Sequence, residues 1–96
     1  MYQINNTINN QGFNKLQISK LNDGPAETLL IVLEKGVTFP EHTAPRDAQI
    51  IVLEGEIDFY INSEVFNIKT HQDFKFPKGE PHWVKAVENS KFLVIR

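Results

Sequence analysis

Short apolar stretches separated by polar turn residues run along most of the chain. Each stretch is rich in Ile, Val, Leu or Phe and is bounded by Gly, Pro, Asn or Asp, a composition typical of β-strands. No segment sustains the repeat of apolar positions that an amphipathic helix shows. The pattern predicts strands at residues 16–20, 27–34, 49–54, 56–62, 64–68, 73–76, 83–87 and 92–95. Many short strands at near-regular spacing predict an all-β sandwich or barrel.

Residues 49–54 differ from the other predicted strands because both of their faces are apolar. Period two puts Ile50 and Val52 on one face and Ile51 and Leu53 on the other. A strand of this kind is buried on both sides. If one face lines a barrel, the other must lie under a second sheet, the N-terminal segment or another subunit.

Composition and charge agree with one small domain. The chain has 96 residues, 41% of them hydrophobic, so residues 1–96 are predicted to form a single domain with one core. Its first ~12 residues are expected to be a loose arm or a cover for a dimer interface. Because the net charge is -2 and Lys and Arg are scattered, we expect no nucleic-acid partner.

The sequence also limits the compartment and the chemistry. No run is as long as a membrane-spanning helix, and the first residues lack the charged and apolar regions of a signal peptide. We therefore expect a cytoplasmic protein without a membrane partner. With no cysteine, disulfides and thiolate metal sites are excluded, and any metal must be held by nitrogen and oxygen. No nucleophile elbow or Gly-rich phosphate loop is present.

One segment reads Gly36, five residues, His42-x-Ala44, three residues, Ala48, six residues and Gly55. It resembles the first motif of the cupin superfamily: Gly, five residues, His-x-His, three or four residues, Glu, six residues and Gly. The two glycines and His42 match this motif. Ala44 stands at its second histidine position and Ala48 at its glutamate position.

A second segment reads Pro77-x-Gly79, two residues, His82, three residues and Ala86. It resembles the second cupin motif: Gly, five residues, Pro-x-Gly, two residues, His, three residues and Asn. Ala86 replaces the closing asparagine, and the opening glycine falls on His71. We expect His71, in a polar stretch, to be a surface residue.

The resemblance implies a small, single-domain RmlC-like cupin with a degenerate metal-binding motif, folded as a double-stranded β-helix, or jelly-roll, barrel. Of the family's four usual metal ligands, His42 and His82 are kept. The resemblance places both inside the barrel, so they should converge although 40 residues separate them. Two nitrogens on one tetrahedral metal lie about 3.3 Å apart. Without metal we expect a looser arrangement, with water or a ligand between the rings.

Metal binding at this site is expected to be weak. A divalent ion (Fe, Zn, Ni or Mn) would have two protein ligands, whereas catalytic zinc sites ordinarily have three. Gln49 takes the glutamate position if a four-residue spacer is allowed, but five residues then separate it from Gly55, so Ala48 aligns better. Alternation turns Glu41 and Asp47 away from His42.

Ala44 and Ala48 have a second expected effect. Because they are smaller than the His and Glu of the motif, they should enlarge the space inside the barrel. Two imidazoles among apolar side chains resemble a small-molecule site more than a redox centre. The predicted lining of this pocket is His42, Ala44, Ala48, Ile50, Val52, Phe59, Phe76, His82 and Val84. Arg46 is interpreted as a local ion-pair partner of Asp47; if it instead folds over the barrel mouth, it is suited to a carboxylate or phosphate.

Trp83 bears on the oligomeric state. Period two turns it to the opposite side of its strand from His82, and hence out of the barrel. It is either an interface anchor or a rim residue under a local loop. Small cupins are commonly dimers, so the resemblance and the doubly apolar strand together predict a homodimer.

Three classes of function stay open. The leading one is a small-molecule-binding cupin that senses or sequesters its ligand. The second is a metal-dependent enzyme of the dioxygenase or isomerase kind. The third is an interaction module in which the barrel is a scaffold. Metal analysis separates the first two, and a barrel interior filled by side chains favours the third.

Overall fold

The computed structural model describes residues 2–96, except for the side chain of Asp23. Every predicted strand is confirmed, the largest difference being the end of the first one, at Asp23. The helix in this range has four residues, in keeping with an all-β chain. The elements are α1 (Thr7–Asn10), β1 (Leu16–Asp23), β2 (Glu27–Leu33), β3 (Thr38–His42), β4 (Ala48–Glu54), β5 (Glu56–Ile61), β6 (Glu64–Lys69), β7 (Asp73–Phe76), β8 (His82–Ala86) and β9 (Ser90–Ile95).

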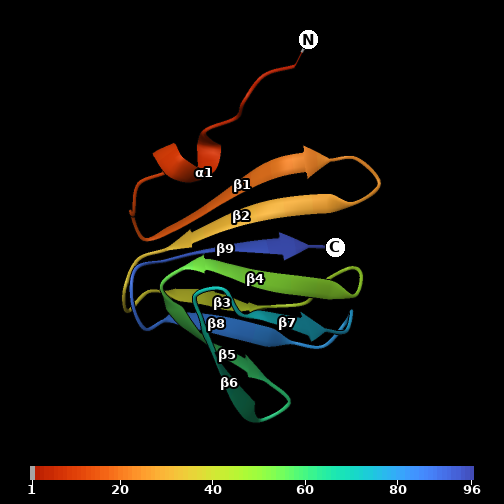
Figure 1. Ribbon diagram of the computed structural model, residues 1–96. Helices are drawn as coiled ribbons and strands as arrows, with labels where there is room; N and C mark the ends of the chain where they lie inside the picture. The colour runs from red at the N-terminus through yellow and green to blue at the C-terminus, as the bar shows by residue number, and fades with distance from the viewer. Residues whose placement is uncertain (1) are drawn as a thin grey trace.

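The strands form two antiparallel sheets that face each other (Figure 1). The larger sheet has the order β1-β2-β9-β4-β7, and the smaller one β3-β8-β5-β6. In the larger sheet β9 lies between β2 and β4, and in the smaller sheet β8 lies between β3 and β5, so that strands far apart in the sequence are neighbours. The all-β jelly-roll barrel expected from the resemblance is confirmed.

β3 is the strand that the apolar pattern missed. It contains Pro40, and its pairing with β8 shifts register between Phe39 and His42. Proline removes a donor from the ladder and weakens the strand signal. Since β3 ends at His42, this irregular strand positions half of the histidine pair described below.

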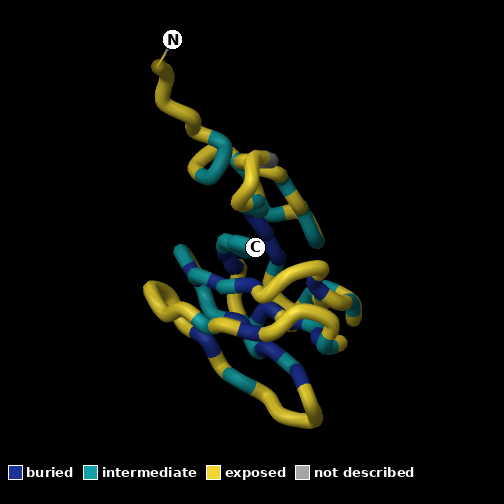
Figure 2. The backbone as a smooth tube through the Cα atoms, turned by 90° about the vertical axis from the view of Figure 1, so that its right-hand side faces the viewer, coloured by how far each residue is buried: buried dark blue, intermediate teal, exposed yellow. Residues whose placement is uncertain are grey.

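The core fills the space between the sheets. Buried segments gather at the centre of the molecule and exposed ones at the loops (Figure 2). Alternation on β5 puts Ile57, Phe59 and Ile61 inward, and Ile50 and Val52 of β4 face them. The buried core residues are Ile31, Leu33, Ala44, Ala48, Ile50, Val52, Ile57, Phe59, Ile61, Ile68, Phe76, Val84, Ala86 and Phe92.

The N-terminal segment covers part of the outer face of the larger sheet. Leu30 and Val32 alternate with the core residues Ile31 and Leu33 of β2, so they point to the outer face of the sheet. They are nevertheless fully buried. Beside them on β9, Lys91 Nζ donates a hydrogen bond to the Ile8 carbonyl (2.7 Å) and lies 5.5 Å from the centre of the Phe13 ring. The segment from α1 to Phe13 is therefore packed against the sheet.

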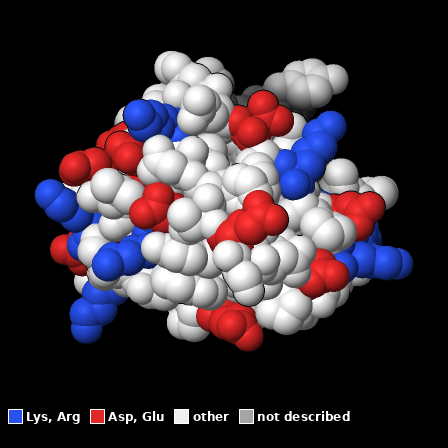
Figure 3. Space-filling view, turned by 90° about the horizontal axis from the view of Figure 1, so that it is seen from below, with Lys and Arg blue, Asp and Glu red and all other residues white. Residues whose placement is uncertain are grey.

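Within residues 2–96 no helix has the length and apolar character needed to cross a membrane. Basic and acidic side chains are interspersed on the face of the molecule seen from below (Figure 3).

Candidate functional site: the histidine pair at the barrel mouth

Two histidines meet where β3 ends and β8 begins. His42 and His82 are paired across the two strands, and their Nε2 atoms lie 3.1 Å apart. His82 is buried (3% exposed), whereas His42 is half-buried and reaches the barrel mouth. The predicted convergence is confirmed. The spacing of 3.1 Å is close to the separation of about 3.3 Å expected for two nitrogens on one tetrahedral metal.

The backbone fixes the tautomer of both rings. His42 Nδ1 lies 2.7 Å from the Pro40 carbonyl oxygen, and His82 Nδ1 lies 2.9 Å from that of Glu80. A carbonyl oxygen only accepts, so each Nδ1 carries a hydrogen and donates it. In a neutral imidazole with this tautomer, Nε2 holds a bare lone pair. Two lone pairs cannot face each other at 3.1 Å without a cation between them, which is either a shared proton or a metal ion.

Electrostatics make His82 the acceptor of a shared proton. Burial, above all, lowers the pKa of His82; positive charge on His42 and Arg96 acts in the same direction, and the Glu80 carbonyl opposes it. Two imidazolium rings in direct contact would repel each other. The pair is therefore built to hold one positive charge.

Aromatic rings hold the imidazoles in place. Phe39 stacks on His42 with ring centres 4.3 Å apart, and Phe59 stacks on His82 at 5.2 Å. Phe76 meets the His82 ring edge-on at 4.6 Å. Because these contacts and the carbonyl bonds fix both ring planes, the pair is preorganised.

The cavity beside the pair is small. Its volume is about 20 Å³, room for about one water molecule. The large cavity expected from the alanines is therefore not formed, and Phe39 and Phe92 are among the residues that line the small one. Of the predicted lining, Ala48 and Val52 lie elsewhere in the core. The residues around the cavity are Phe39, His42, Ala44, Ile50, Phe59, Phe76, His82, Val84, Phe92, Val94 and Arg96.

A metal ion fits this arrangement only in part. The carbonyl bonds to Nδ1 are the outer contacts that metal-binding histidines usually have, and they direct both Nε2 atoms to one point. A third ligand is missing: residues 2–96 contain no group of three His, Cys, Asp or Glu side chains that could hold a metal. The pair alone is a half-site, to be completed by water or by a ligand.

Gln49 does not complete the site. It lies on the outer face of β4, where its Nε2 donates to Asp73 Oδ2 at 3.0 Å, while its neighbour Ala48 is buried inward. The suggestion of Gln49 as an oxygen ligand is wrong, because its side chain is bound to Asp73 on the outer face, whereas Ala48 faces the core. Asp47 is also turned away, accepting a hydrogen bond from the Lys78 amide.

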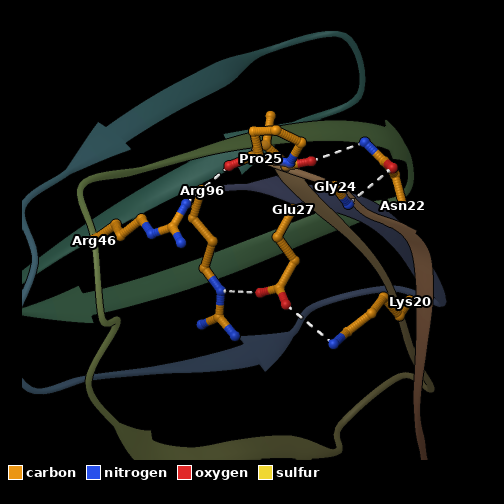
Figure 4. Close-up of polar contacts among 8 residues, drawn as sticks. Lys20, Asn22, Gly24, Pro25, Glu27, Arg46 and Arg96 are labelled. Carbon is orange, nitrogen blue, oxygen red and sulfur yellow. Dashed lines mark hydrogen bonds and ion pairs between the residues drawn. The ribbon is translucent and has the colours of Figure 1, made fainter.

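The remaining candidate residues lie outside the pair. Arg46 Nη1 donates to the Pro25 carbonyl at 2.9 Å (Figure 4), and in the described part of the chain no ion pair joins it to Asp47, so that interpretation is wrong. His71 is exposed, as predicted. Trp83 faces out of the barrel, as predicted, and stacks on Tyr60 of β5 with ring centres 3.7 Å apart.

Residues 29–96 match the profile of the family described as "Cupin domain". The chain belongs to the cupin family. No curated protein sequence matches it.

Solved structures agree on the fold of this cupin. An RmlC-like cupin from Desulfovibrio desulfuricans superposes with a TM-score of 0.85 at 22% identity, covering 99% of this chain and 95% of that one. A conserved protein of unknown function from Streptococcus pyogenes gives 0.78 at 24% identity, covering 99% and 93%. A cupin 2 conserved barrel domain protein from Leptotrichia buccalis gives 0.80 at 30% identity over 88% of this cupin and 42% of that longer chain.

The buried His82 predicts a specific pH dependence of stability. Its pKa is lowered in the folded state from an ordinary value of 6.5. Below that pH the unfolded chain binds a proton that folded His82 resists, so the free energy of unfolding should fall as the pH drops through 6.5. Urea denaturation with chelator at pH 7.5 and 5.5 measures this loss. It should be smaller in His82→Gln and unchanged in His71→Gln, and equal losses in all three proteins would contradict the assignment.

Proposed function

We propose that this cupin binds a small molecule at the barrel mouth, with His42 and His82 as its central polar contacts. The observation that carries the proposal is the preorganised imidazole pair, set among apolar and aromatic side chains and reachable through the half-buried His42. The cavity beyond the pair admits about one methyl group or water, so the ligand approaches from the mouth rather than filling the barrel.

A fragment screen tests this proposal. Amide shifts of the ¹⁵N-labelled protein are recorded with a library of small polar molecules, and hits should perturb residues near His42 and His82. They should be lost in His82→Leu and kept in His71→Gln, the matched surface histidine. A library that perturbs no residue of the site would instead favour the interaction-scaffold function, which the filled barrel interior also supports.

A metal-dependent enzyme remains the second candidate, because the tautomer of both rings directs their lone pairs to one point. A bound divalent ion would supply Lewis-acid chemistry there. The role of the chain's own residues is to fix two ligands and to exclude water with the surrounding phenylalanines.

Elemental analysis separates the two candidates. Since the structure supplies two protein ligands and no third, protein from ordinary medium should carry well under one equivalent of iron, zinc, nickel or manganese. A stoichiometric metal that disappears in both His42→Ala and His82→Ala, but stays in His71→Gln, would place the enzyme first.

We also propose a homodimer. Ile51 and Leu53 on the outer face of β4 are only half-buried in one chain, and Trp83 with Tyr60 forms an aromatic pair on the opposite outer surface. Apolar surfaces of this kind are typical of subunit interfaces. Sedimentation equilibrium at tens of micromolar should give about twice the 11.0 kDa of one chain. A monomer at that concentration would rule the dimer out.

A further inference from the structure

Arg96 is the charged residue at the mouth that the sequence did not single out. Its backbone continues the β2–β9 ladder, with hydrogen bonds of 2.9 and 2.8 Å to Glu27 in the two directions. Its side chain is 22% exposed and its Nε donates to Glu27 Oε1 at 2.6 Å. The backbone and the side chain of Arg96 are thus both held in place, and the guanidinium has a defined position beside the cavity.

The ion pair with Glu27 engages only the Nε atom of this guanidinium. Arg96 lines the same cavity as Phe39 and the histidine pair. Its two terminal nitrogens have no hydrogen-bond partner among the described residues, and Figure 4 shows them directed away from Glu27. An arginine in this state offers a planar, two-pronged donor next to the site.

The surroundings of Arg96 carry an excess of positive charge. Glu27 is shared with Lys20, whose Nζ lies 3.2 Å from Oε2, and hydrogen bonds from Arg96 and Lys20 lower the pKa of Glu27, which stays ionised. Arg46, bound to the Pro25 carbonyl, lies on the same side of the barrel (Figure 4). One carboxylate, Glu27, is therefore shared by two cations, in a chain whose net charge is -2.

We propose that Arg96 is the anion anchor of the ligand site, and that the ligand is a small monocarboxylate. Its two oxygens accept hydrogen bonds from the terminal nitrogens of Arg96, and its negative charge lies beside the polar histidine pair. The inference rests on the proposed function, since it assumes that a ligand occupies the mouth. A planar carboxylate matches the two-pronged guanidinium. The small cavity and the partial compensation by Glu27 favour a small ligand with one negative charge.

Acetate and acetamide form a matched pair of probes, because they have nearly the same shape and differ in charge. Titrated against the ¹⁵N-labelled protein, acetate should shift the amides around residues 42, 82 and 96 and bind at least about tenfold more tightly than acetamide. Arg96→Gln should remove that preference. Arg96→Lys, which keeps a cation for Glu27, should retain part of it, and Lys35→Gln, at an exposed ion pair, should retain all of it.

The outcomes separate this inference from the function on which it rests. Equal binding of acetate and acetamide at the mouth would overturn the carboxylate and leave the small-molecule site standing. Tighter binding of inorganic phosphate than of acetate would overturn the ligand class. If no probe in the fragment library reaches the mouth, the proposed function fails, and this inference with it. Should Arg96→Gln not fold, the acetate and acetamide comparison on the unaltered protein decides.

Discussion

Gly55→Ala should lower the free energy of unfolding by about 3 kcal/mol or more, through backbone strain and overpacking together. Gly55 has a φ of +89°, a left-handed conformation that L side chains rarely adopt. A Cβ there would also overlap the Asn89 carbonyl oxygen and Ser90. Ser90 is itself fully buried, and its hydroxyl accepts a hydrogen bond from the Glu56 amide, so it has no room to move.

Gly36→Ala is the matched control for this effect. Gly36 has nearly the same φ, +81°, but nothing lies within 4 Å of a Cβ built on it. The Gly36→Ala substitution should therefore lower the free energy of unfolding only by the strain of the left-handed backbone, about 1 to 2 kcal/mol. Urea denaturation of both variants measures the difference. Equal losses would show that the close approach of the β4–β5 turn to residues 89–90 does not matter.

Phe59→Ala should cost about 3 to 5 kcal/mol, the range for truncating a buried phenylalanine. Phe59 is fully buried and contacts Phe74, Phe76 and His82. The truncation removes the ring that stacks on His82, so the cavity beside the histidine pair should grow and the order of the pair should fall.

Phe66→Ala provides the comparison. Phe66 is half-buried on β6 and packs on Phe74, away from the histidines. Its truncation should cost clearly less and leave the histidine resonances unchanged. Chemical denaturation and histidine side-chain NMR together test both variants. Comparable losses for the two would contradict a core centred on Phe59.

Most of the fold could be predicted from the sequence because period-two alternation and turn residues mark the strands strongly. β3 is the exception, since Pro40 and its polar neighbours hide it. That omission had a consequence for the site: Phe39, which β3 carries, was not counted among the residues that line the cavity.

The candidate site was predictable only in part. The resemblance to the cupin motifs was enough to bring His42 and His82 together, and alternation turns Gln49 outward once Ala48 faces in. The tautomers depend on the backbone carbonyls of Pro40 and Glu80, which no side-chain pattern reveals.

Arg96 had a signal that could have been used. Period two along β9 puts Phe92, Val94 and Arg96 on one face, and all three line the cavity. Its partner Glu27 lies directly opposite it, at the start of the neighbouring strand β2, a pairing that depends on tertiary register.

The central claim is that His42 and His82 form one unit in which both Nδ1 atoms are protonated and the two Nε2 atoms share a single cation. Long-range ¹H–¹⁵N correlation spectra of histidine-labelled, metal-free protein at neutral pH measure this directly. The account predicts Nδ1-bound hydrogens on both rings of the pair. A bare Nδ1 on either ring of the pair, with its hydrogen on Nε2 instead, would contradict it.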